Sequence, residues 1–147
     1  MHSFFNAPIL TGIIKIIESM FQSNLEVRGY ELDSFNHVNN AVYLNYFEHA
    51  RWELMKEKGI IDYFTKTGNF LVVVETTIKY IREAKLFDKM IINTTLERED
   101  PYLIFHHEML HSGSNKKVSK ATVKTLFLDE TRTPIDMPQE ILRILNG

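Results

Sequence analysis

The stretch Asp33-Ser34-Phe35-Asn36-His37-Val38-Asn39-Asn40-Ala41-Val42-Tyr43 carries more information than any other part of this 147-residue chain. It places an acid, a histidine and two asparagines in a short loop, directly before a segment with helical periodicity. The first turn of a helix offers unpaired N–H groups and a partial positive charge, which suit a developing oxyanion. A carboxylate facing such a helix start is a hydrolytic geometry, so the stretch favours acyl-transfer chemistry.

The segment after this loop has the spacing of a long amphipathic helix. Its apolar residues recur at intervals of three and four, at Tyr43, Phe47, Ala50 and Leu54. Asn39 or Asn40 is expected to be the N-cap, and Gly59 to end the helix in a left-handed conformation after about five turns. A helix of this length is expected to form the centre of the fold.

Alternating apolar and polar residues predict strands on both sides of the helix. One strand precedes the loop, where Leu25, Val27 and Gly29 alternate with polar residues. Further strands are expected over Phe70–Ile81, Met90–Leu96, Leu103–Met109 and Val118–Leu128. A loop is expected around Thr65–Asn69, and a short helix over Gln139–Leu145. One long helix against a mostly antiparallel sheet is an α+β architecture.

The composition is that of an ordinary globular domain. Hydrophobic residues make up 44% of the chain and charged residues 24%, and the length suits one core. A formal net charge of -2 gives no general attraction for nucleic acid, so no such partner is expected. The chain contains no cysteine, which excludes disulfides and thiol catalysis and is compatible with a cytoplasmic location.

Residues 1–22 are interpreted as an N-terminal extension, and residues 23–147 as the main domain. Ile9–Met20 is rich in apolar residues, but Lys15 and Glu18 interrupt it and it is too short to span a bilayer. No integral membrane segment is therefore expected, and the features of a signal peptide are lacking. Two interpretations stay open: a short amphipathic helix docked on the domain or on a partner, or extra coding sequence before a true start at Met20.

Three groups of residues carry a resemblance to a known family. They are Val27–Asp33 with His37–Asn40 and Tyr43–Glu48, Val73–Glu75 with Ile78–Tyr80 and Arg82, and Arg132–Pro134 with Met137–Pro138. Together they resemble the hotdog-fold acyl-CoA thioesterases of the 4-hydroxybenzoyl-CoA thioesterase type, over nearly the whole chain from Leu25 to Leu145. The resemblance implies an antiparallel sheet wrapped around the long helix. It also implies a homodimer or homotetramer with active sites at the dimer interface.

The same resemblance implies roles for the loop. Asp33 maps to the catalytic carboxylate, the main-chain N–H of Asn40 to the group that polarises the thioester carbonyl, and His37 to a supporting polar residue. The expected substrate-binding residues are Asn36, Val38, Asn39 and Tyr43. A thioester carbonyl is electrophilic without metal activation, so no cofactor or metal is expected. Asp33 either attacks this carbonyl or deprotonates a water, and the sequence leaves both routes open.

Two positions depart from the family pattern. Asn36 stands where the family usually has glycine, and asparagine tolerates a positive φ better than other residues. The family's benzoyl-CoA member has an arginine and lysine cluster in a region that corresponds here to Glu99–Tyr102, which is acidic or neutral. That way of holding the nucleotide phosphates therefore does not carry over.

Several of these residues also have ordinary structural interpretations. Asp33 can be a turn residue, His37 can bond its own loop, and Tyr43 can belong to the core. Glu48 is a second candidate carboxylate, because another branch of hotdog thioesterases uses a glutamate on the helix. It lies about two turns from the helix start, which favours a salt bridge over catalysis.

Two further clusters have both a functional and an ordinary interpretation. Of His106, His107 and His111, the last two share a strand face but have Cα atoms about 13 Å apart, too far for one metal ion without other ligands. The only basic stretch contains Lys116, Lys117, Lys120 and Lys124. It is either a solvated face or a site for coenzyme A phosphates or an acidic acyl carrier protein (ACP).

The leading hypothesis is a thioesterase that hydrolyses acyl-CoA, or acyl-ACP, to the free acid and the thiol. One alternative is a hotdog dehydratase or hydratase acting on hydroxyacyl or enoyl thioesters, with His37 and Glu48 as the nearest acid–base candidates. Another is a non-catalytic hotdog module that binds acyl thioesters. Asp33 at the thioesterase position favours hydrolysis over both.

Overall fold

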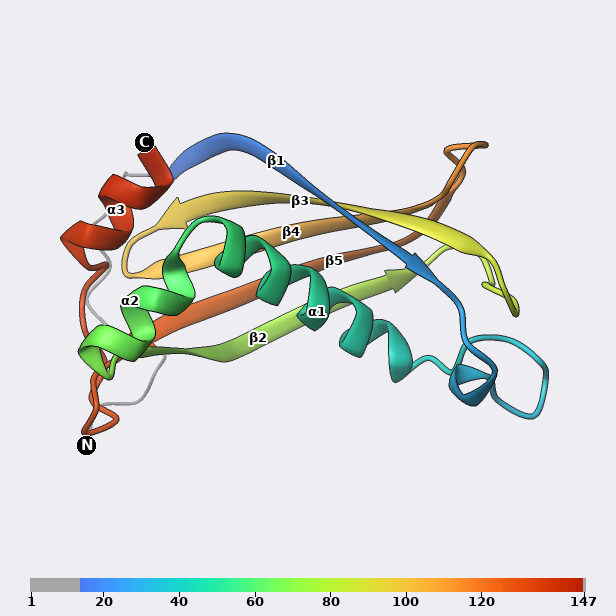
Figure 1. Ribbon diagram of the computed structural model, residues 1–147, viewed down its shortest axis with the longest axis horizontal. Helices are drawn as coiled ribbons and strands as arrows, with labels where there is room; N and C mark the ends of the chain where they lie inside the picture. The colour runs from blue at the N-terminus through green and yellow to red at the C-terminus, as the bar shows by residue number, and fades with distance from the viewer. Residues whose placement is uncertain (1–13, 147) are drawn as a thin grey trace.

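The computed structural model describes residues 14–146 (Figure 1). In chain order its elements are β1 (Ile14–Glu26), a 3₁₀ helix η2 (Gly29–Glu31), α1 (Val42–Glu57), α2 (Ile60–Thr67), β2 (Phe70–Tyr80), β3 (Lys89–Glu99), β4 (Tyr102–His111), β5 (Lys117–Leu128) and α3 (Gln139–Asn146). The five strands form one antiparallel sheet in the order β1-β3-β4-β5-β2. Figure 1 shows α1 lying across this sheet. The expected α+β class is therefore confirmed.

The inner face of the sheet and one face of α1 form the core. Met90, Ile92 and Leu96 alternate along β3 and are fully or almost fully buried, as are Phe47 and Leu54 on the helix. Burying each such side chain contributes about 1.5–3 kcal/mol. The period of two in β3 and the spacing of three and four in α1 therefore predicted the correct buried faces.

The glycines at 59 and 68 divide the helical region in two. Helix α1 has 16 residues, and Gly59 follows it with a φ of 78°, in the predicted left-handed conformation. Helix α2 was not predicted; it ends at Gly68, which has a φ of 77°. The loop expected around Thr65–Asn69 is therefore wrong over most of its length, because helical turns continue to Thr67.

The interpretation of Ile9–Met20 as an amphipathic helix is wrong over residues 14–20, and the first part of this segment lies outside the described residues. These residues begin β1, which pairs with β3 from Ile14 opposite Glu99 to Glu26 opposite Lys89. Pairing with a distant strand decides the conformation here, and an isoleucine-rich segment has high strand propensity. The strand continues across residue 22, where the extension was expected to end.

A bulge in β2 changes which face its side chains occupy. The register with β5 shifts between Val73 and Glu75, so simple alternation, which would put every second residue from Phe70 to Tyr80 on one face, is wrong for this strand. Phe70 packs in an outer cluster with Tyr102 and Ile104, whereas Ile78 packs in the cluster that contains α1 residues. The bulge inserts one extra residue and so inverts the alternation of side chains between the two faces of the sheet. Ile78 and Tyr80 therefore lie on the face that packs against α1.

Candidate active site

Asp33 closes the loop before α1 with hydrogen bonds inside the loop. Its N–H donates to the His37 carbonyl oxygen at 2.8 Å, and its Oδ1 accepts the N–H groups of Phe35 and His37 at 2.9 and 3.3 Å. Asn36 has a φ of 61°, so the turn adopts the conformation anticipated for the missing glycine. Within residues 14–146 the other carboxylate oxygen, Oδ2, has no hydrogen-bond partner.

A second turn in the molecule has the same hydrogen bonds. Asp129 Oδ1 accepts the N–H groups of Thr131 and Thr133 at 2.8 and 3.0 Å, and Asp129 N–H donates to the Thr133 carbonyl. Arg132 has a φ of 66° at the position that corresponds to Asn36. The turn alone is thus a structural motif, and Asp33 differs from Asp129 in its surroundings.

The peptide groups before α1 are held by Asn39 and by β2. Asn39 Oδ1 accepts the N–H of Ala41 at 2.9 Å, and Ala41 is the N-cap, so the expected cap at Asn39 or Asn40 was wrong. The asparagine side chain closes an Asx turn just before the helix instead. The Asn40 carbonyl accepts the Tyr80 hydroxyl at 2.9 Å, whereas its N–H has no acceptor in the described chain. This N–H is available to a ligand.

Asp33 and Asn40 line one open cleft of about 360 Å³. His37, Val38 and Tyr43 also line it, whereas Asn36 and Asn39 hold the loop beside it. Four further residues that were not predicted to belong to the site also line the cleft: Tyr80, Ile81, Arg82 and Glu83. Tyr80 follows the β2 bulge, and its ring packs edge-to-face on Tyr43 with 5.1 Å between the ring centroids. The bulge therefore brings a second element to the loop.

Glu83 orients His37 in this cleft. Its Oε2 lies 2.7 Å from His37 Nε2, and its Oε1 lies 3.3 Å from Lys85 Nζ. The main chain supports the pair, because Val38 N–H donates to the Ala84 carbonyl at 2.9 Å. No local pattern could have shown this contact, since the two partners belong to segments that only the sheet brings together.

Residues 27–145 match the model of a family described as the thioesterase-like superfamily. The chain belongs to this superfamily. This thioesterase is 30% identical over 129 residues to the chloroplastic acyl-acyl carrier protein thioesterase ATL3 of Arabidopsis thaliana. The aligned region covers 86% of this chain and 68% of the relative. It is 39% identical over 77 residues to the long-chain acyl-CoA thioesterase FadM of Escherichia coli, covering 52% and 58% of the two chains.

Solved structures give the same fold. The probable thioesterase YbaW from Escherichia coli superposes with a TM-score of 0.79 at 29% identity, covering 85% of this chain and 96% of that one. A 1,4-dihydroxy-2-naphthoyl-CoA thioesterase from Synechocystis, at 14% identity and a TM-score of 0.78, shares the fold alone. The expected hotdog fold is confirmed, and the chain is a thioester hydrolase.

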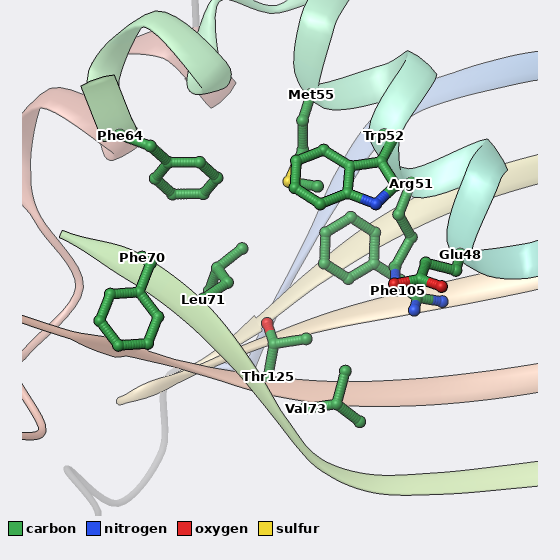
Figure 2. A pocket seen from close by; sticks show the side chains of 10 residues that line it. All are labelled: Glu48, Arg51, Trp52, Met55, Phe64, Phe70, Leu71, Val73, Phe105 and Thr125. Carbon is green, nitrogen blue, oxygen red and sulfur yellow. The ribbon is translucent and has the colours of Figure 1, made fainter. Parts of the chain in front are cut away.

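A second cavity of this thioesterase lies farther along α1 (Figure 2) and has a volume of about 130 Å³. Glu48 lines this cavity and not the Asp33 cleft. Glu48 lies eight positions after Asn40 in the sequence, which corresponds to about 12 Å along a helix axis. Within one chain, therefore, the second candidate carboxylate does not face the free N–H of Asn40.

A buried histidine supports the wall of this second cavity. His107 is 3% exposed, with Nδ1 2.8 Å from Thr94 Oγ1 and Nε2 3.4 Å from Arg51 Nη1. An arginine only donates hydrogen bonds, so Nε2 must accept and Nδ1 must carry the proton. Burial, and to a smaller extent the charges of Arg51 and His106, together lower the pKa of His107 to about 3.

This neutral His107 predicts an acid-dependent loss of stability. Its pKa is lowered in the folded state, so below about pH 6.5 the unfolded chain binds a proton that the folded chain does not. The free energy of unfolding should therefore fall by about 1.4 kcal/mol per pH unit as the pH decreases from about 6.5 towards 3. Urea unfolding of the wild type and of His107→Gln at several pH values measures this contribution. A difference between them that does not change with pH would contradict it.

The remaining charged clusters have partners of their own. His106 pairs with Glu97, and the described residues contain no group of three or more His, Asp or Glu placed to hold a metal ion. Lys117 and Lys120 both lie 3.6 Å from one carboxylate, that of Glu108. None of the described helices is long and apolar enough to cross a membrane.

Proposed function

We propose that this thioesterase cleaves an acyl-CoA or acyl-ACP in the cleft between Asp33 and the start of α1. One observation carries this proposal: Asp33 and Asn40 line the same cleft, and within residues 14–146 one carboxylate oxygen of Asp33 and the main-chain N–H of Asn40 have no hydrogen-bond partner. The first supplies a nucleophile or base, and the second a donor for the oxyanion. Asp129, whose turn has the same hydrogen bonds, lines neither this cleft nor the second cavity.

The chemistry follows from these two groups. The thioester oxygen binds the Asn40 N–H, where the positive end of the α1 dipole also stabilises the developing charge. Asp33 either attacks the carbonyl carbon, expelling the thiolate and leaving a mixed anhydride that water cleaves, or takes the proton of an attacking water. Both routes consume one water and release the acid and the thiol. His37, oriented by Glu83, is a supporting polar group in this cleft.

The other loop residues act on the substrate in two ways. Val38 and Tyr43 are buried side chains that line the cleft and offer it apolar surface. Burial raises the pKa of Tyr43, so its phenol stays protonated at neutral pH. Asn36 and Asn39 contribute through the loop conformation that they stabilise.

We propose that the charged carrier binds a lysine face, formed by Lys79 on β2 and by Lys117 and Lys120 on β5. Lys79 and Lys120 are directly opposed across these strands, and a bound anion would reduce the repulsion between them. Glu108 is shared by Lys117 and Lys120, and Arg82 reaches the same segment through the Lys117 carbonyl at 2.9 Å. The phosphates of coenzyme A or an acidic face of ACP would complete this surface, and the relatives named above include both carrier types.

We also propose that two copies of the chain pair to complete the site, either in a homodimer or within a homotetramer. Strand β2 is an edge of the sheet, and Val73 on it is 47% exposed, although edges are normally protected. A homodimer that joins two β2 edges would cover this strand. We also propose a cytoplasmic location, with which the absence of cysteine is compatible.

The dehydratase alternative lacks a supporting observation. It needs a histidine and a carboxylate facing the same substrate carbons, and within one chain His37 and Glu48 line different cavities. Thiol release from a panel of acyl-CoA and acyl-ACP substrates of increasing chain length tests the proposed function. We expect release from at least one carrier, and a rate of release that is reduced by about 10²- to 10⁴-fold when Asp33 is replaced by asparagine.

A further inference from the structure

The second cavity has an apolar wall and one polar end. Figure 2 shows Glu48 and Arg51 reaching from α1 to one end, while Phe64 and Phe70 lie towards the other. Thr125 also lines the cavity, but its hydroxyl already donates to the Leu103 carbonyl at 2.6 Å. The polar groups left to meet a ligand are therefore the Arg51 guanidinium, the Glu48 carboxylate and the indole N–H of Trp52, which also lines the cavity.

The guanidinium is held in place by a chain of buried contacts. Thr94 fixes His107, and His107 accepts a hydrogen bond from Arg51. The Arg51 guanidinium carbon also lies 5.9 Å from the centre of the Phe105 ring. Phe47 stacks on the other side of the network, with its ring centroid 5.1 Å from that of His107. These contacts fix the direction of the donors, as a specificity site requires.

Most of the donors of Arg51 remain unused. A guanidinium has five N–H bonds, and among residues 14–146 only the His107 ring accepts one. Glu48 is the nearest opposing charge: it raises the pKa of Arg51, while burial, the larger effect, lowers it. The two side chains form no ion pair in the described structure, so an acceptor between them would satisfy the free donors.

We propose that this cavity selects an acyl group that carries a neutral oxygen, a hydroxyl or a keto group, which accepts from Arg51. The inference rests on the proposed thioesterase function and names its substrate class. A plain alkyl chain bound in this cavity would displace water from the guanidinium and leave it without an acceptor. A second carboxylate on the chain would be repelled by Glu48. A hydroxyl fits both residues, because it accepts from the guanidinium and donates to the carboxylate.

Dodecanoyl-CoA and its β-hydroxy, β-oxo and ω-hydroxy derivatives provide the test, with pantetheine thioesters as replacements if coenzyme A is not the carrier. For wild type, we expect kcat/KM for at least one oxygenated substrate to exceed that for dodecanoyl-CoA by about 10- to 100-fold. Arg51→Met keeps the length of the stem and removes the donors, so it should abolish this ratio while dodecanoyl-CoA is still cleaved. Lys56→Met, which removes an exposed cation from the same helix, should preserve the ratio.

The substrate panel distinguishes a failure of the cavity inference from a failure of the proposed thioesterase function. If wild type cleaves all four thioesters with equal kcat/KM, the cavity inference is wrong and the thioesterase function stands, whether or not Arg51→Met folds. If wild type releases thiol from none of the panel on either carrier, the proposed function fails. Glu48→Gln adds a second readout: it should reduce the preference for a hydroxyl and keep that for a keto group. An equal loss of both preferences would contradict the bridging role of Glu48.

Discussion

Asp33→Asn is expected to reduce thioester turnover by about 10²- to 10⁴-fold, the range for loss of a positioned acid–base group. Asparagine keeps an oxygen at Oδ1, so it can still accept the N–H groups of Phe35 and His37 and preserve the loop. It loses the carboxylate oxygen that has no partner in the described structure. Steady-state kinetics should therefore show a loss in kcat, with a melting temperature close to that of the wild type.

The molecule contains a matched control for this substitution. Asp129→Asn makes the same change in a turn with the same hydrogen bonds, outside the cleft. Turnover should stay within about threefold of the wild type, because surface substitutions away from special features have small effects. If both variants lose activity equally, the turn is required for folding and Asp33 has no special role. If neither loses activity, Asp33 is not the catalytic carboxylate.

Val73→Glu should convert a dimer to a monomer and remove most of the activity. The side chain is 47% exposed on the β2 edge, where a homodimer would place two copies close together. Two carboxylates at such an interface repel each other, and the burial of an unpaired charge is costly. Sedimentation velocity, with activity measured on the same samples, gives both readouts.

Val73→Thr is the control, since it keeps the branched shape and adds no charge. It should remain a dimer and retain activity. Val73 also lines the second cavity, so the comparison with threonine separates the effect of charge from a change in cavity shape. A wild type that is monomeric at micromolar concentrations and fully active would contradict the proposed interface.

Local sequence patterns correctly predicted those elements whose conformation depends on residues close by in the chain. Met90 and Ile92 alternate along β3 and are buried, and Gly59 ends α1, because each depends only on nearby residues. Helix α2 was missed because it is a segment of eight residues between two glycines, too short to show periodicity. Neither of the two interpretations of Ile9–Met20 was a strand, because the partner that makes residues 14–20 a strand, β3, lies far along the chain.

The same distinction between local and long-range contacts applies to the residues of the candidate site. Asp33 and Asn40 could be named from the sequence, because the loop and the helix that position them are adjacent. Glu83 and Tyr80 could not, since their contacts with the loop depend on sheet pairing and on the β2 bulge. Arg51 gave no signal of its own either, because its direction is fixed by His107 from another strand.

The most direct test of the central claim is to measure, on one sample of the purified chain, both free thiol and free acid formed from acyl-CoA or acyl-ACP. We predict that the two products appear in equal amounts, at a rate that Asp33→Asn lowers and Asp129→Asn does not. Hydration of an enoyl thioester with no thiol released, or tight binding of the thioester with no reaction, would contradict hydrolysis in the Asp33 cleft.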